Sequence, residues 1–194
     1  MEHRGAAFPP LGTCGRVGRV VSGRAGTGLC LGAGRLDHGQ GAQSGGRTKK
    51  STPANEALGR SRGGFGTKVH AVVDALGNCL HLALTPGEAA DRPQLPGLLA
   101  ALPQQPGAVV AGKAYDTNHV LKTLAQGEIE AVIPPKANRL DQRAYDENLY
   151  ADRNKVERFF GRLKEARGFA TRYEKTATSF LAVAHLLAAL DWMR

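Results

Sequence analysis

Hydrophobic and polar residues alternate along residues 65–84 with the two-residue period of a β-hairpin. The first half alternates Phe65, Thr67, Val69, Ala71 and Val73 with the polar residues Lys68, His70 and Asp74. A turn at Leu76, Gly77 and Asn78 then leads into Leu80, Leu82 and Leu84. Since a period of two places successive side chains on opposite faces, the pattern predicts a hairpin with one buried face.

The pattern after the hairpin predicts alternating helices and strands. Helices are expected at residues 92–102 and 117–126, and buried strands at residues 108–111 and 131–133. Pro134 and Pro135 end the second strand, because proline has no N–H to donate to a sheet. One helix near Tyr150 and another at residues 177–194 complete the chain. This order indicates an α/β domain built on a sheet.

The helix near Tyr150 carries two separate stripes. Val156, Phe159, Phe160 and Leu163 recur at helical spacing and predict an apolar stripe that packs on the core. Tyr150, Arg153, Glu157 and Lys164 fall within a second stripe about 60° wide, which predicts one carboxylate among two cations and a phenol beside a cleft. The same spacing also fits an ordinary surface helix in which Arg153 and Glu157 form an i,i+4 pair.

The first fifty residues differ in composition from the rest. They hold 13 of the 25 glycines and eight Lys or Arg against Glu2 and Asp37, with no isoleucine or tyrosine. Such a composition cannot supply a packed core, and no helical or strand period persists. We therefore predict a disordered Gly/Arg-rich segment at residues 1–50, followed by one domain at residues 51–194.

The net charge and the cysteine content indicate what kind of partner the protein binds and in which compartment it resides. A formal charge of +9 and a pI near 9.8 predict a polyanionic partner, with nucleic acid the natural candidate; ribosomal proteins and anionic membranes also fit the charge. Three separated cysteines without zinc-ligand spacing indicate a reduced, cytoplasmic chain. The apolar run at residues 180–193 carries His185 and Asp191, which favours a buried terminal helix over a membrane span.

The Tyr-x2-Arg-x3-Glu-x6-Lys pattern of Tyr150, Arg153, Glu157 and Lys164 resembles the signature of bacterial insertion-sequence transposases of the DDE class. Segments 59–65, 67–70, 113–116, 132–136 and 171–176 resemble the IS-five type of the wider IS-four group. The resemblance covers roughly residues 50–194. It implies a ribonuclease-H-like mixed sheet with flanking helices, Mg²⁺ bound by three carboxylates, and metal-dependent DNA strand cleavage and transfer at terminal inverted repeats, with a homo-oligomer as a further expectation.

The resemblance assigns roles to individual residues. Glu157 matches the third carboxylate, as catalytic residue and metal ligand. The residues expected to contact DNA are Tyr150, Arg153, Lys164, Arg62, Lys136 and Arg139. A third possibility, covalent recombination with Tyr150 as nucleophile, would need activating Arg and His residues around the phenol.

Two expected carboxylates are absent. Gly112 occupies the second position, and the nearest acid is Asp116, where the family pattern already has an aspartate. Asp37 is the only acid between Glu2 and Glu56, and no apolar strand surrounds it, so the first strand is expected to be missing or scrambled. We therefore expect impaired Mg²⁺ binding and a catalytically defective transposase, or alternatively a non-catalytic DNA-binding protein derived from one. The abrupt change in composition also suggests the hypothesis that residues 1–49 are translated out of frame.

Overall fold

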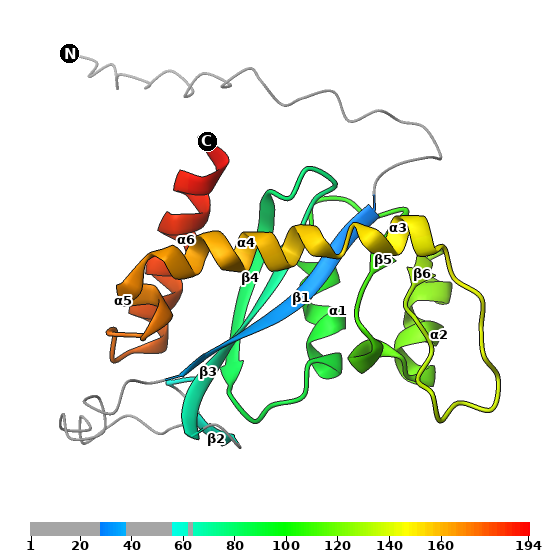
Figure 1. The fold of residues 1–194 in the computed structure, drawn as a ribbon, viewed down its shortest axis with the longest axis horizontal. Helices are drawn as coiled ribbons and strands as arrows, with labels where there is room; N and C mark the ends of the chain where they lie inside the picture. Colours follow the sequence, from blue (N-terminus) through cyan, green and yellow to red (C-terminus); the bar gives the residue numbers. More distant parts are fainter. Residues whose placement is uncertain (1–27, 38–55, 62–63) are drawn as a thin grey trace, which may run out of the picture.

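A mixed sheet with helices on both faces forms the framework of the computed structural model, which describes residues 28–37, 56–61 and 64–194 (Figure 1). The strands are β1 (Gly28–Asp37), β2 (Gly59–Ser61), β3 (Gly64–Val73), β4 (Cys79–Pro86), β5 (Ala108–Val110) and β6 (Glu130–Val132). Their order is β2-β3-β1-β5-β6, and β4 also pairs with β3. Pairing is antiparallel among β1 to β4 and parallel between β1, β5 and β6. The expected α/β mixed sheet with flanking helices is confirmed.

Helices cover the two faces of the sheet and enclose two apolar clusters. They are η2 (Arg92–Gln94), α1 (Leu95–Ala100), η3 (Lys113–Tyr115), α2 (Asn118–Gln126), α3 (Glu147–Ala151), α4 (Asn154–Glu165), α5 (Arg167–Ala170) and α6 (Ala177–Trp192). One cluster lies under α4 and α6, and the other under α1 and α2. The terminal helix α6 packs on the core through Phe180, Ala184 and Ala188, but it is buried on one face only, since Leu186, Leu190 and Trp192 are exposed. Within the described ranges, no helix is long and apolar enough to cross a membrane.

The predicted hairpin is confirmed, but its burial differs from the prediction. Strands β3 and β4 are joined by a turn in which the Asp74 carboxylate accepts from the amides of Leu76 (2.8 Å) and Asn78 (2.9 Å), and Gly77 has a φ of 91°. The prediction of a single buried face is wrong for β3, because His70 and Val72, which lie on the face opposite Val69, are also fully buried. The reason is that Val69, Ala71 and Val73 pack in the cluster under α4 and α6, whereas Val72 packs in the cluster under α1 and α2.

Burial of His70 gives the protein a pH-dependent stability. Burial lowers the pKa of His70 to about 4, while Nε2 shares a 2.8 Å hydrogen bond with Thr85 Oγ1. Because the unfolded chain binds this proton near pH 6.5, we expect the free energy of unfolding to drop by roughly 2 kcal/mol between about pH 7 and about pH 5. Urea denaturation of the protein and of His70→Asn measures the loss. The loss should shrink in His70→Asn and persist in His119→Gln, whose side chain is exposed; equal losses in all three proteins would contradict the assignment.

Strand β1 corrects the prediction for the first fifty residues. Residues 28–37, expected to be disordered, form the central strand of the sheet, antiparallel to β3 from Cys30–Val73 to Asp37–Gly66 and parallel to β5. The expectation of a missing or scrambled first strand is therefore wrong. The remainder of that segment, residues 1–27 and 38–50, lies outside the described residues, and the out-of-frame hypothesis stays a prediction.

The glycines of β1 make room for side chains of α4. A Cβ on Gly32 would lie 2.8 Å from both Cγ atoms of Val156, and one on Gly34 would lie 2.8 Å from the Phe160 ring. The two residues from Gly32 to Gly34 span about 6.6 Å of strand, and the four residues from Val156 to Phe160 span about 6 Å of helix. Because the two distances are similar, α4 can run along β1 and make both contacts. The glycine-rich composition therefore did not predict this strand, because α4 supplies the apolar side chains that pack over the two glycines of β1.

Candidate functional site

The signature residues lie on two short helices rather than one. Helix α3 ends at Ala151 and α4 begins at Asn154, with Asp152 and Arg153 in a turn between them. The Arg153 amide donates to the Tyr150 carbonyl at 3.0 Å, an i→i+3 bond that tightens the chain at this point. The prediction that four residues share one continuous helical face is therefore wrong.

The apolar stripe of α4 is confirmed, and it turns the charged residues outward. Its four residues, Val156, Phe159, Phe160 and Leu163, are all buried. Arg153 and Glu157 form an ion pair of 2.7 Å, with 38% and 55% of their side-chain areas exposed. Lys164 is exposed and lies about 10.5 Å along the helix from Glu157. The half-buried Tyr150 ring packs edge-on against Tyr145, with 5.5 Å between ring centroids.

Gly112 lies directly beside this ion pair. It follows β5 in an extended conformation, and a Cβ at this position would lie 3.5 Å from Arg153 Nε, an ordinary van der Waals contact. The residue at 112 therefore faces Arg153, the partner of Glu157. A Cβ atom fits at this position without a clash, but glycine provides no oxygen ligand.

Asp37, the acid of β1, does not lie at the end of the strand that pairs with β5. Cys30 pairs with Val110 near the end of β5, and Gly32 faces the start of α4. Asp37 pairs with Gly66 at the other end of β1, about 23 Å along the strand from Cys30. In the part of the chain that the structure describes, no group of three His, Cys, Asp or Glu residues is placed to hold a metal ion. Glu157, already paired with Arg153, does not fit a two-metal site, which requires several carboxylates.

Asp116 is engaged elsewhere. Its side chain is fully buried, and its carboxylate accepts from the Lys136 amide (2.8 Å) and Arg139 Nε (2.9 Å), with Arg143 Nη1 at 3.5 Å. Burial by itself would raise the pKa of Asp116, but the Lys136 amide and the two guanidinium groups outweigh burial and hold the pKa below its ordinary value. Asp116 therefore anchors the segment after β6 and cannot replace the carboxylate absent at Gly112.

Two of the other residues expected to contact DNA, Lys136 and Arg139, lie in the segment that follows β6. Val110 pairs with Val132, so the segments that begin at Lys113 and Pro134 leave the sheet side by side. Lys136 and Arg139 belong to the second segment, whereas Arg62 lies outside the described residues. Contact of these residues with DNA stays a prediction. Sequence patterns gave no sign of Arg143, because its contacts with Asp116 and the Ile133 carbonyl (2.7 Å) follow no helical or strand period.

The motif at residues 171–176 serves the fold rather than this site. Arg172 is buried and donates to the carbonyls of Glu56 (2.6 Å) and Ala57 (3.3 Å) and to the Thr67 hydroxyl. Its guanidinium lies 5.0 Å from the centre of the Phe180 ring. Arg172 thus joins the segment before β2 to β3 and α6.

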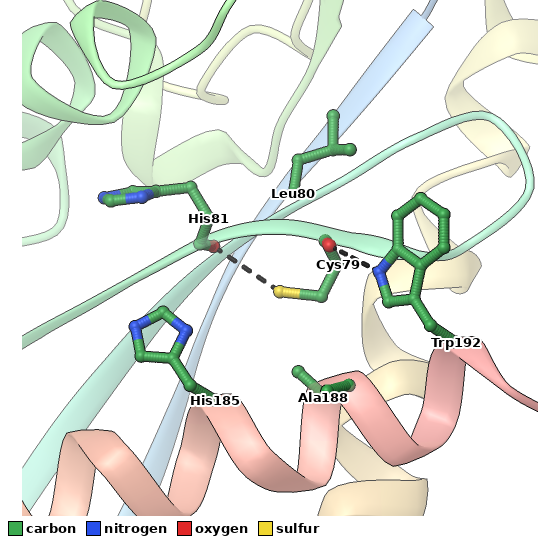
Figure 2. Close-up of a pocket in the computed structure, with 7 residues that line it drawn as sticks. Cys79, Leu80, His81, His185, Ala188 and Trp192 are labelled. Atoms are coloured by element: carbon green, nitrogen blue, oxygen red, sulfur yellow. Dashed lines mark hydrogen bonds between the residues drawn. The ribbon is translucent and has the colours of Figure 1, made fainter. Parts of the chain in front are cut away.

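A pocket of ≈310 Å³ opens between β4 and α6 (Figure 2). Strands β3 and β1 separate β4 from β5 in the sheet. Trp192 Nε1 donates to the Cys79 carbonyl at 2.7 Å, and the Cys79 thiol lies beside the His81 carbonyl (Figure 2). Burial raises the pKa of this thiol to about 12, so it stays protonated and unreactive at neutral pH.

Comparison of the sequence with known sequences points to one family. The profile of the family described as "Transposase DDE domain" matches residues 39–192. A protein of Brucella ovis, named as a transposase for insertion sequence element IS6501, is 41% identical over 130 residues, which are 66% of this chain and 98% of that protein. The solved Mos1 transposase paired-end complex with the left transposon end aligns with 84% of this chain and 52% of its own chain, at 15% identity and a TM-score of 0.36.

Proposed function

The chain belongs to the DDE transposase family, and from that premise we propose that it is an insertion-sequence transposase that still binds DNA but has lost metal-dependent strand cleavage. Its targets would be the terminal inverted repeats of the element. A homo-oligomer bound to these repeats belongs to the same proposal. Without cleavage activity, the protein would act as a non-catalytic DNA-binding derivative of a transposase that competes with an intact relative for DNA.

The loss of cleavage is proposed from one observation, the environment of Glu157. In this family divalent metal ions activate the attacking oxygen and stabilise the leaving one, and they are held by several carboxylates. Here Glu157 pairs with Arg153 at 2.7 Å, and the adjacent position is Gly112. A guanidinium neutralises the single carboxylate, so the negative charge that would attract two Mg²⁺ ions is missing.

The retained DNA binding is proposed from basic residues on two segments. Arg153 and Lys164 lie at the start and near the end of α4, and Lys136 and Arg139 lie on the segment after β6. A net charge of +9 favours binding to the phosphate backbone of DNA. Contacts between basic side chains and phosphates position the DNA without reading its sequence. Glu157 would orient Arg153 toward a phosphate through their ion pair.

A DNA-binding and cleavage assay tests both halves of the proposal. The probe is a supercoiled plasmid that carries the coding sequence with its flanking DNA, incubated with or without Mg²⁺ or Mn²⁺. We expect binding that weakens by about a hundredfold or more between about 50 mM and about 200 mM KCl, because several phosphates are neutralised, and no metal-dependent nicking. The double variant Arg153→Ala/Lys164→Ala should bind with a smaller salt dependence.

Two results would contradict the proposal. Metal-dependent nicking that disappears in Glu157→Gln would mean that the site still assembles a metal centre. Binding that is absent at low salt would remove the DNA-binding role. A covalent protein–DNA adduct lost in Tyr150→Phe would instead favour the recombinase mechanism considered from the sequence.

A further inference from the structure

Asp116 lies at the centre of a polar cluster, and the proposed function gives Asp116 itself no role. The cluster consists of Asp116, Asn118, Lys136, Arg139 and Arg143 and connects the end of β5 with the segment after β6. Its single acid is fully buried, whereas the side chains of Arg139 and Arg143 keep 26% and 29% of their areas exposed. The acid is therefore inside and the cations reach the surface.

The hydrogen bonds fix the direction of the basic groups. Arg139 is held at two points, through Nε to Asp116 (2.9 Å) and through Nη2 to Asn118 Oδ1 (2.8 Å). Arg143 is held by the Ile133 carbonyl at 2.7 Å and by Asp116 at 3.5 Å. An arginine loses considerable side-chain entropy when it binds a phosphate, and prior fixation reduces that loss.

The backbone of the same segment depends on Asp116 as well. The Lys136 amide donates to Asp116 Oδ2 at 2.8 Å, and the Gln142 side chain donates to the carbonyls of Lys136 (3.1 Å) and Arg139 (2.7 Å). The loop from Lys136 to Gln142 is thereby closed on itself and attached through one carboxylate to the residue that follows η3.

We propose that Asp116 is the positioning residue of the DNA-binding surface, and that it holds Arg139, Arg143 and Lys136 in the arrangement that meets the phosphate backbone. This inference rests on the proposed DNA binding and deepens it. It reverses the simple electrostatic expectation for an acid in a DNA-binding protein. Removal of a negative charge normally strengthens binding to DNA, whereas removal of this one frees two arginines and a loop, and so weakens binding.

The test compares Asp116→Asn with Asp141→Asn. Both changes remove one negative charge, and Asp141 is exposed in the same segment. Affinity is measured by fluorescence anisotropy with a short fluorescein-labelled DNA duplex of arbitrary sequence, over a series of KCl concentrations. For Asp116→Asn we expect binding weakened by about tenfold at low salt and a salt slope reduced by about 1–2, equivalent to one or two lost phosphate contacts. Asp141→Asn should bind equally well or slightly better.

The salt slope separates positioning from simple loss of stability. A partly unfolded variant binds with a lower apparent affinity, but its folded fraction keeps the original slope, and urea denaturation gives that fraction independently. In an Arg139→Ala background, Asp116→Asn should change the slope by less than it does alone. An unchanged salt slope for Asp116→Asn, or tighter binding by this variant, would overturn the positioning role of Asp116. The proposed DNA binding would still stand if the wild-type protein binds. If the wild-type protein does not bind DNA, both proposals fail.

Discussion

Replacement of Arg172 by alanine should lower the free energy of unfolding by roughly 3–5 kcal/mol, because a buried hydrogen-bonded cation is removed from a network that cannot repair itself. The carbonyls of Glu56 and Ala57 would lose their donor. The Phe180 ring would also lose the guanidinium at 5.0 Å. Urea denaturation followed by far-UV circular dichroism measures the difference.

Two further variants make the Arg172 result specific. Arg172→Met keeps the aliphatic stem and loses only the donors, so most of the destabilisation should remain. Arg158→Ala removes an exposed arginine from α4 and should change stability by less than about 0.5 kcal/mol. If Arg172→Ala were no more destabilising than Arg158→Ala, water rather than Arg172 would satisfy the two carbonyls.

Replacement of Gly32 by alanine should destabilise the protein by about 2–3 kcal/mol, since the added methyl would lie 2.8 Å from both Cγ atoms of Val156. Val156→Ala removes those two atoms and leaves the Val156 Cβ at 3.4 Å. In a double-mutant cycle, the combined variant should therefore be more stable than the sum of the single changes by about 1–2 kcal/mol.

The glycine cycle has a direct control within the protein. Gly97 has nothing within 4 Å of its Cβ position and lies in a helix, so Gly97→Ala should leave stability unchanged or raise it. Additive losses in the Gly32 and Val156 cycle would mean that β1 moves away from α4 to accept the methyl group. Close packing of this strand against the helix would then not be a requirement of the fold.

The elements with strong periodicity were predictable from the sequence. The hairpin, the strands around Val109 and Val132, and helices α2 and α6 were expected within a few residues of their observed bounds. Each of these elements carries its own apolar residues at the period of its structure, so local pattern and tertiary burial agree. The apolar stripe of α4 was predictable for the same reason.

Strand β1 and the turn at Asp152 were not predictable because neither is determined locally. The apolar partners of Gly32 and Gly34 are more than a hundred residues away in the sequence, on α4. The turn between α3 and α4 is accompanied by a hydrogen bond from the Cys30 thiol to the Asp152 carbonyl at 3.1 Å. A one-dimensional pattern contains no information on contacts of this kind.

The candidate site was predictable in part. The sequence located Glu157, Arg153 and Gly112, and the structure places Arg153 in contact with Glu157 and next to the Gly112 position. The buried role of Asp116 was missed, since an acid in a loop has no periodicity that distinguishes a solvated carboxylate from one held by two arginines.

The packing of β1 also sets an order for folding during synthesis. The strand emerges from the ribosome early, yet its ladder partners in β3 and β5 follow later, and the side chains that cover its glycines belong to α4. Its bond from Cys30 to Asp152 closes a loop of 122 residues. Long-range contacts of this kind form slowly, because chain entropy is lost before they can contribute. The middle of the sheet therefore becomes stable only after α4 has been made, and the growing chain must remain soluble until then.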